Sequence, residues 1–464
     1  MRVKWLVSMA LIGLLPSLGT AQQIKPPGAA HTGVDFLVIR DELAAPSSPT
    51  VQPEPIPFPA REAGPAAGLT LAELEATAER CNPTLAQAAA RVQAARGQCL
   101  QVGLYPNPVV GYQGSEIGDE GRAGQQGGFI SQEIVTAGKL RLNRAIACQE
   151  IQQAECVWAA QRFRVLTDVR RGFYEVLVAQ RTVELTEQLV GIGARGVKAA
   201  EELLKAKEVA RADVLQARIE ADSARILLDK ARNRYAGAWR NLAAVVGDPA
   251  LQPTQLAGGL QDGTARFTWE DTLSRLLAES PQLAGAQAGV ARAHAALSRE
   301  CAGRVPNVEL QAGVQYDNAT RDTIAGVQVG IPIPIYNRNQ GNIAKAQAEL
   351  AAAQHEVQRV QLALQQRLAA VFEQYATAQQ QVEKYTRDIM PSAQESLKLV
   401  SAGYRQGEFG YLVLLTAQRT YFQTSLAHLE ALRDLRAATA AIEGNLLSDS
   451  LQTSEAPERG PQQR

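Results

Sequence analysis

The 464-residue sequence is poor in the residue types that build metal centres and cofactor sites. It contains four histidines, five cysteines, three methionines and 5% aromatic residues. Metal ligands come in clusters, whereas His294, His355 and His428 stand apart from one another. The cysteines are odd in number and form no CxxC pair, so we expect free thiols rather than a disulfide framework. We predict no metal site and no cofactor.

Excess charge, long apolar runs and catalytic motifs are also missing. The 47 basic and 47 acidic residues balance, so no basic surface for nucleic acid is indicated. No apolar run approaches the ~18 residues of a transmembrane helix. The sequence contains no GxSxG, HExxH or P-loop motif. We therefore predict that the protein is not an enzyme.

The N-terminus has the features of an export signal. Arg2 and Lys4 precede a short apolar run, Trp5–Leu15, and the small residues Gly19-Thr20-Ala21 fit a cleavage site. We interpret residues 1–21 as a secretory signal peptide. Because no cysteine follows the apolar run, we expect no lipid anchor.

Two flanking segments lack the patterns of packed structure. Residues 22–68 are rich in proline, with proline at alternate positions near Val51–Pro59, which favours polyproline II and excludes helix. We predict a linker or extended arm there. Residues 448–464 are polar and contain two prolines, and we predict a disordered tail.

The region between these segments is an internal repeat. Several marker residues of its first half recur in the same order in its second half. They are Asn82-Pro83 with Ser280-Pro281, Gly103 and Pro106-Asn107 with Gly303 and Pro306-Asn307, and Val214-Leu215 and Ala217 with Leu414-Leu415 and Ala417. We predict one repeat at 69–260 and another at 261–447, each running helix, strand, strand, long helix, turn, helix.

Apolar residues at alternating spacings of three and four predict long helices with coiled-coil seams. One such run extends from Lys139 to about Leu204, which corresponds to about 100 Å of helix. We expect an interruption at Gly191 and Gly193 in the first repeat and at Pro391 in the second, since glycine weakens a helix and proline removes a hydrogen bond.

Alternation of apolar and polar residues predicts two strands in each repeat. In the second repeat these are Val308–Tyr316 and Val327–Ile335, and in the first Tyr105–Ser115 and Gly127–Ala137. Each run has about ten residues, the length of a tilted strand that crosses a bilayer. We expect the apolar residues of Val308–Tyr316 to face lipid. The alternating polar residues should line a water-filled pore: Glu309, Gln311 and Gln315.

Four strands are too few to close a membrane barrel, because about eight are needed and an open edge leaves unpaired backbone groups in lipid. The barrel must therefore be shared between chains, and three chains supply twelve strands. The predicted fold class is an α+β membrane channel, in which a long α-helical coiled-coil tunnel adjoins a shared twelve-stranded barrel in a trimer.

Three motifs resemble those of the TolC-like outer-membrane efflux proteins. They are Ala212-Asp213-Val214-Leu215-Gln216-Ala217-Arg218, then Gly403–Gly407 followed by Tyr411–Arg419, and Ile331–Gly341. The third is similar to the strand-to-helix junction of the heavy-metal subgroup. The resemblance covers essentially 69–447.

The resemblance implies a bacterial outer-membrane channel with a periplasmic helical tunnel, acting passively in a tripartite efflux system. It implies a homotrimer that contacts outer-membrane lipid, a periplasmic adaptor (membrane fusion) protein, and an inner-membrane pump of the proton-driven resistance-nodulation-division type. A periplasmic coiled-coil adaptor or a structural protein is the alternative.

The two turns between long helices are the expected adaptor contacts, since exposed apolar groups mark interaction sites. The residues that we assign to these turns are Glu208, Val209, Ala210 and Asp213 in the first repeat, and Gly407, Glu408, Phe409, Gly410 and Tyr411 in the second. We expect Asp213 to cap its helix and to narrow the entrance through a hydrogen bond to the neighbouring turn. In relatives with an acidic entrance ring, aspartates stand where this chain has Val413 and Thr416.

Overall fold

The computed structural model describes residues 68–452 except 122, 206, 208, 262–265 and 407. The predicted signal peptide, nearly all of the predicted arm and the end of the predicted tail lie outside the described residues. Within the described part of the chain, no helix is both long and apolar enough to span a membrane.

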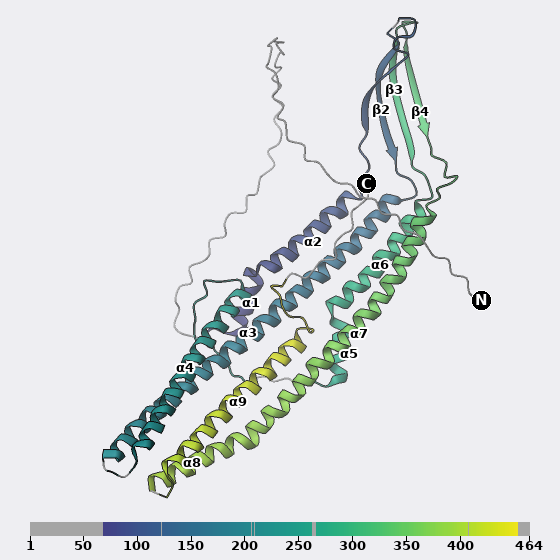
Figure 1. Ribbon diagram of the computed structural model, residues 1–464. Helices are drawn as coiled ribbons and strands as arrows, with labels where there is room; N and C mark the ends of the chain where they lie inside the picture. Colours follow the sequence, from purple (N-terminus) through teal and green to yellow (C-terminus); the bar gives the residue numbers. More distant parts are fainter. Residues whose placement is uncertain are drawn as a thin grey trace, which may run out of the picture. The chain divides into compact units, whose positions relative to one another are not determined.

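Both repeats have their strands and long helices in the predicted order (Figure 1). The first consists of α1 (Leu71–Cys81), α2 (Pro83–Gln101), β1 (Val109–Ser115), a 3-10 turn η1 (Asp119–Gly121), β2 (Gln125–Ile134), α3 (Lys139–Lys205) and α4 (Arg211–Val246). The second consists of α5 (Trp269–Glu279), α6 (Pro281–Ala302), β3 (Val308–Asp317), β4 (Thr323–Gly330), α7 (Gln340–Lys384), a π-helical turn η2 (Tyr385–Ile389), α8 (Met390–Gln406) and α9 (Tyr411–Glu443).

The repeat markers Asn82-Pro83 and Ser280-Pro281 divide two helices in each repeat. Asn82 caps α2 by accepting a hydrogen bond at Oδ1 from the Thr84 N–H at 2.9 Å, and Pro83 is the first residue of that helix. Proline is well suited to a first helical position because its missing N–H has no partner there. Pro281 begins α6 in the same way. The single helix predicted ahead of the strands is therefore a pair of helices.

The core forms where the short helices cover the long ones. In the first repeat, Leu74 of α1 packs with Val169 and Phe173 of α3 and with Trp239 and Leu242 of α4, all buried. Apolar residues spaced three and four apart along α4, such as Val214, Ala217 and Ala221, are buried at nearly every step. In the second repeat α7 and α9 bury their own cluster, which includes Tyr375, Ala378 and Leu435. The helix α3 also packs against α6 and α9, which joins the two repeats.

The expected interruption at Gly191 and Gly193 is wrong, because α3 runs unbroken from Lys139 to Lys205. A glycine costs a helix only about 1 kcal/mol relative to alanine, and the α3–α4 seam compensates for that cost. Gly193 serves close packing, since a Cβ at this position would lie 3.1 Å from Ala221 Cα of α4.

This difference between the two glycines gives a testable prediction. We expect Gly193→Val to destabilise the α3–α4 hairpin by about 1–3 kcal/mol through overpacking. Gly191→Val should have a much smaller effect, because a Cβ there would meet only the end of the Arg195 side chain, at 3.8 Å. Limited proteolysis of the hairpin measures the difference, and equal protease sensitivity of the two variants would contradict this packing.

The interruption predicted at Pro391 is confirmed. The π-helical turn η2 precedes it, and the Met390 N–H bonds to the Tyr385 carbonyl, five residues back. Pro391 has no N–H to donate to the carbonyl four residues earlier, so the helix changes its register just before it. The second repeat alone carries this break among the described residues.

The four strands form one antiparallel sheet in the order β1-β2-β3-β4. The predicted strand Val327–Ile335 is too long at its end, because β4 stops at Gly330. Pro332 and Pro334 lack the N–H groups that a ladder needs. In the first repeat β1 begins at Val109, after Pro106 and Pro108, rather than at Tyr105.

Candidate functional site

Most polar side chains of the sheet lie on one face, and the opposite face is largely apolar. The registers place odd-numbered residues of β1, β2 and β3 on the same face as even-numbered residues of β4. The polar side chains on that face are Gln113, Ser115, Gln125, Ser131, Glu133, Glu309, Gln311, Gln315, Asp317 and Gln328. The three predicted pore-lining residues are among them. Gln311 Nε2 also donates a hydrogen bond to Gln113 Oε1 at 3.4 Å, which joins β3 to β1 across β2 on this face.

The opposite face is largely apolar and solvent-accessible. Its large side chains are Val110, Tyr112, Ile130, Ile134, Leu310, Val314, Tyr316, Val327 and Val329, which the structure leaves exposed. The glutamines on this face, Gln126 and Gln132, both donate to main-chain carbonyls, those of Ala123 and Pro106. A continuous apolar face of this kind is what a sheet presents to lipid.

Two residues on the polar face were not predicted from the sequence. Phe129 of β2 lies close to Gly111 of β1, since a Cβ on that glycine would come within 2.5 Å of the Phe129 ring. Glu133 of β2 stands directly opposite Glu309 of β3. The signal was the period of two through Phe129, Ser131 and Glu133, which the glycines of the first repeat obscured.

A polar network holds the end of the sheet to the helices. Asn307 Nδ2 donates to Glu133 Oε1 at 2.6 Å, and Asn307 Oδ1 accepts from Lys139 Nζ at 2.5 Å. Lys139 also donates to the Val305 carbonyl at 2.5 Å. Burial and the charge of Arg299 lower the pKa of Lys139, and the charge of Glu133 opposes them. This network sets the position of Glu133 beside Glu309.

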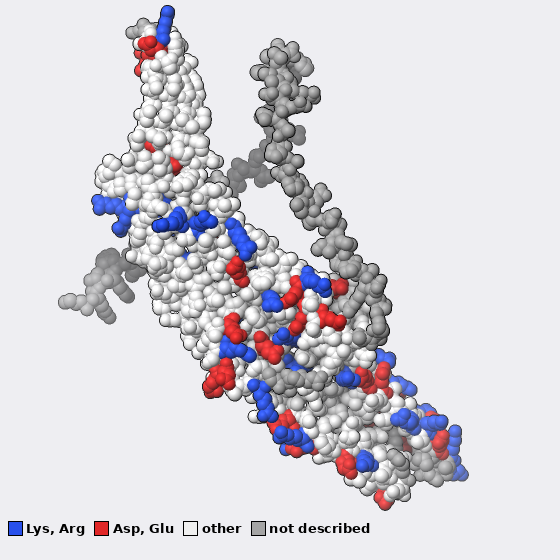
Figure 2. Space-filling model, turned by 180° about the vertical axis from the view of Figure 1, so that it is seen from behind, with Lys and Arg blue, Asp and Glu red and all other residues white. Residues whose placement is uncertain are grey.

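Charges are distributed unevenly over the described residues (Figure 2). The helices carry mixed charges, many of them in ion pairs such as Arg170 with Glu75 and Arg234 with Glu175. The face of the strands seen in Figure 2 is nearly free of charge apart from its two ends. Charge on the strands is therefore confined to a few positions, of which Glu133 and Glu309 form one directly opposed pair.

The turns between long helices lie at the end of the helical region away from the sheet (Figure 1). Glu208 and Gly407 lie outside the described residues, and the side chain of Tyr411 is not described. Ala210 and Gly410 are exposed and immediately precede α4 and α9, whereas Val209 is half-buried. The structure therefore places the described turn residues at or just before two helix starts.

Phe409 is 42% exposed and packs on its own hairpin. A Cβ on Gly403 of α8 would come within 2.4 Å of the Phe409 ring, so the glycine makes room for the aromatic group. The Glu408 N–H donates to the Gly403 carbonyl at 2.9 Å and closes the turn. Leu412 and Val413, in the first turn of α9, are exposed as well.

Asp213 does cap its helix, from the third helical position rather than as the N-cap residue. Its Oδ2 accepts a hydrogen bond from the Ala210 N–H at 3.0 Å. A carboxylate at this position also interacts favourably with the helix dipole. The described hydrogen bonds of Asp213 join it only to Ala210 of its own turn. They therefore give no support to the expected hydrogen bond from Asp213 to the neighbouring turn.

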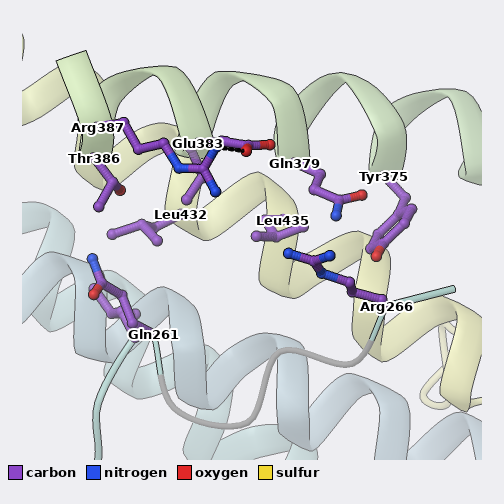
Figure 3. Close-up of a pocket in the computed structure, with 11 residues that line it drawn as sticks. Gln261, Arg266, Tyr375, Gln379, Glu383, Thr386, Arg387, Leu432 and Leu435 are labelled. Atoms are coloured by element: carbon purple, nitrogen blue, oxygen red, sulfur yellow. Dashed lines mark ion pairs between the residues drawn. The ribbon is translucent and has the colours of Figure 1, made fainter. Parts of the chain in front are cut away.

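A cavity of about 320 Å³ lies beside the π-helical turn (Figure 3). Tyr375, Glu383 and Arg387 reach it from α7 and η2, and Leu435 from α9. Glu383 and Arg387 form an ion pair with each other. Arg266 approaches from the opposite side in Figure 3. This arrangement is a crevice between packed helices at the point where α7 changes its register.

Comparison with known proteins places this geometry in a family. The family described as "Outer membrane efflux protein" matches residues 76–248 and 272–446, which correspond to the two repeats. The cobalt-zinc-cadmium resistance protein CzcC of Cupriavidus metallidurans is 28% identical over 386 residues, covering 83% of this chain and 91% of that protein. The outer membrane efflux protein BepC of Brucella suis is 25% identical over 325 residues, covering 65% and 69%.

Solved structures show the same fold. The chain matches CusC with a TM-score of 0.69 at 19% identity, over 82% of this chain and 92% of that one. It matches the outer-membrane channel OprN with a TM-score of 0.68 at 18% identity, over 82% and 91%.

The chain belongs to the outer membrane efflux protein family. It is an outer-membrane channel of tripartite efflux systems, with a helical extension in the periplasm and no enzymatic role. Channels of this family form trimers and work with partner proteins. The alternative of a periplasmic adaptor or structural coiled coil is thereby excluded.

Proposed function

We propose that three copies of the chain close their sheets into one twelve-stranded barrel whose polar face lines the pore. The described sheet ends in two edges, β1 and β4. Unpaired edges in lipid cost several kcal/mol per group, so each β4 should pair with β1 of the next protomer. Glu309, Gln311 and Gln315 then face water, and Leu310 and Val314 face lipid.

Conduction through this pore is passive in our proposal. The helical turns, with Val209, Ala210, Asp213 and Glu408–Tyr411, receive the periplasmic adaptor. The exposed Phe409, Leu412 and Val413 support this assignment because they offer an apolar surface at the end of the hairpin. Energy comes from an inner-membrane pump of the resistance-nodulation-division type, which the resemblance to the heavy-metal subgroup favours.

The proposed substrates are metal cations. The observation that carries this proposal is the pair Glu133 and Glu309, directly opposite each other on the polar face. Like charges directly opposite each other destabilise a sheet. We therefore infer that this pair has a function that offsets its cost in stability. In a trimer the pair becomes a ring of carboxylates, the arrangement that selects cations in channels. The similarity to a cobalt-zinc-cadmium resistance protein agrees with this charge.

The cation selectivity of the channel in planar bilayers tests the proposed role of this carboxylate ring. We expect Glu133→Gln with Glu309→Gln to reduce cation preference, measured as a smaller reversal potential across a salt gradient at low ionic strength, where charge effects are strongest. The control is Glu79→Gln, which removes a carboxylate paired with Arg162 in the helical region. An unchanged reversal potential in the double variant would overturn the role of the ring.

Substrate class is tested in an efflux-deficient host that supplies the adaptor and pump of a metal system. We expect the chain to restore growth in cobalt, zinc or cadmium salts and the double glutamine variant to restore it less. Growth restored only in a matched host that supplies the adaptor and pump of a drug system, and only against organic drugs, would refute metal cations as substrates and leave the channel function intact.

A further inference from the structure

Two thiols from separate segments meet where the first repeat's hairpin leaves the helices. Cys99 is in the last turn of α2, Cys148 is near the start of α3, and their Sγ atoms lie 3.6 Å apart. Cys99 is buried and Cys148 is exposed. The two helices pack along each other, so this contact belongs to an ordered interface.

We propose that Cys99 and Cys148 form a disulfide in the mature protein. The sulfurs need to approach from 3.6 Å to the ~2.05 Å of a disulfide, which side-chain rotation and a small helix displacement achieve. Both helices belong to the periplasmic extension, and the bacterial periplasm is an oxidising compartment in which disulfides persist. The proposal rests on the outer-membrane location established above.

The oxidant is a periplasmic thiol–disulfide oxidoreductase. The exposed Cys148 thiolate attacks the oxidant's disulfide, forms a mixed disulfide and releases one oxidant thiolate. The Cys99 thiolate then attacks Cys148 Sγ and displaces the second oxidant sulfur. The two cysteines lose two protons and two electrons, and the oxidant is reduced to its dithiol. The hydrogen bond with Cys99 and burial raise the pKa of Cys148, while the charge of Arg144 opposes this shift.

The bond would fix the base of one hairpin and leave the other unconstrained. The loop that it closes contains both β1 and β2, whose ends emerge from α2 and α3. The second repeat contains a single cysteine, Cys301, and has no equivalent pair. The disulfide therefore ties α2 to α3 within about the first three turns of α3.

Peptide mapping tests the bond directly. The Cys156→Ala variant is purified as trimers from outer membranes without reductant, unfolded with maleimide present and digested with trypsin. Cleavage after Arg96, Arg122, Arg144 and Arg162 gives peptides 97–122 and 145–162, each with one cysteine in this variant. We expect these peptides to be joined, with two hydrogen atoms fewer than their sum, and Cys81 and Cys301 to carry maleimide.

Maleimide on both Cys99 and Cys148 in outer-membrane trimers would overturn the disulfide without affecting the channel assignment. A second measurement uses thermal dissociation of the trimer. Reductant should lower the dissociation temperature of the wild-type protein but not that of Cys99→Ala with Cys148→Ala. An equal response of the two proteins to reductant would contradict the proposal, whereas failure to reach the outer membrane at all would contradict the location instead.

Discussion

Replacing Val314 with arginine should prevent the trimer from assembling in the outer membrane, and replacing its neighbour Gln315 with arginine should not. Val314 is 55% exposed on the apolar face of β3, and Gln315 is on the polar face. Arginine on the lipid face near the bilayer midplane costs about 2–4 kcal/mol. A trimer meets this cost three times, whereas arginine at Gln315 would remain in water.

The measurement is the amount of heat-resistant trimer in outer-membrane fractions, with single-channel conductance of whatever assembles. We expect Val314→Arg to lose most of its trimer and Gln315→Arg to form trimers with altered conductance. A Val314→Leu variant keeps the apolar face and serves as the control. Comparable trimer yields from the two arginine variants would show that the assignment of the faces is wrong.

The sequence predicted the architecture because its repeats and periods reflect packing directly. The spacing in α4 anticipates buried residues such as Ala217, Ala221 and Leu242, since each must face α3. The alternation in β3 similarly anticipates which side chains share a face. These patterns are local, and one chain is enough to reveal them.

The predictions that failed concern effects that depend on more than local pattern. The glycines of α3 were expected to break it, but an isolated glycine costs little when a partner helix packs against it. The interruption predicted at Pro391 is confirmed, because no packing contact can replace the helical hydrogen bond that proline, without an N–H, cannot donate. The same rule ends β4 at Gly330, although the apolar alternation continues through Ile331, Ile333 and Ile335.

The candidate site was predicted only in part, because some of its residues meet through pairing. The regular alternation of β3 identifies Glu309 from the sequence. Only the β2–β3 register shows that Glu133 stands opposite it. Cys99 and Cys148 are 49 positions apart, and their contact follows from how α2 packs on α3. Sequence spacing favoured neither pair, so the structure was needed to find both.

Replacing Phe409 with aspartate should abolish adaptor binding while leaving trimers intact. Phe409 is partly exposed in the turn between α8 and α9 and packs against Gly403. Figure 1 shows this turn at the end of the helices away from the sheet. Loss of an apolar anchor at an interface costs about 2 kcal/mol or more, which corresponds to a reduction in affinity of about thirtyfold. A charge at this position adds the penalty of burying it under the adaptor.

Crosslinking to the adaptor in cells, together with trimer yield, measures this effect. Gly403→Val gives an independent route to the same loss, because its side chain would occupy the space of the Phe409 ring and displace it without adding charge. Leu362→Asp is the control, since Leu362 is an exposed apolar residue in α7, away from the turns. If both turn variants crosslink as strongly as the control, the adaptor binds elsewhere on the helices. If trimers are lost as well, Phe409 supports assembly rather than docking, and the apolar surface beside Leu412 and Val413 serves contacts between protomers.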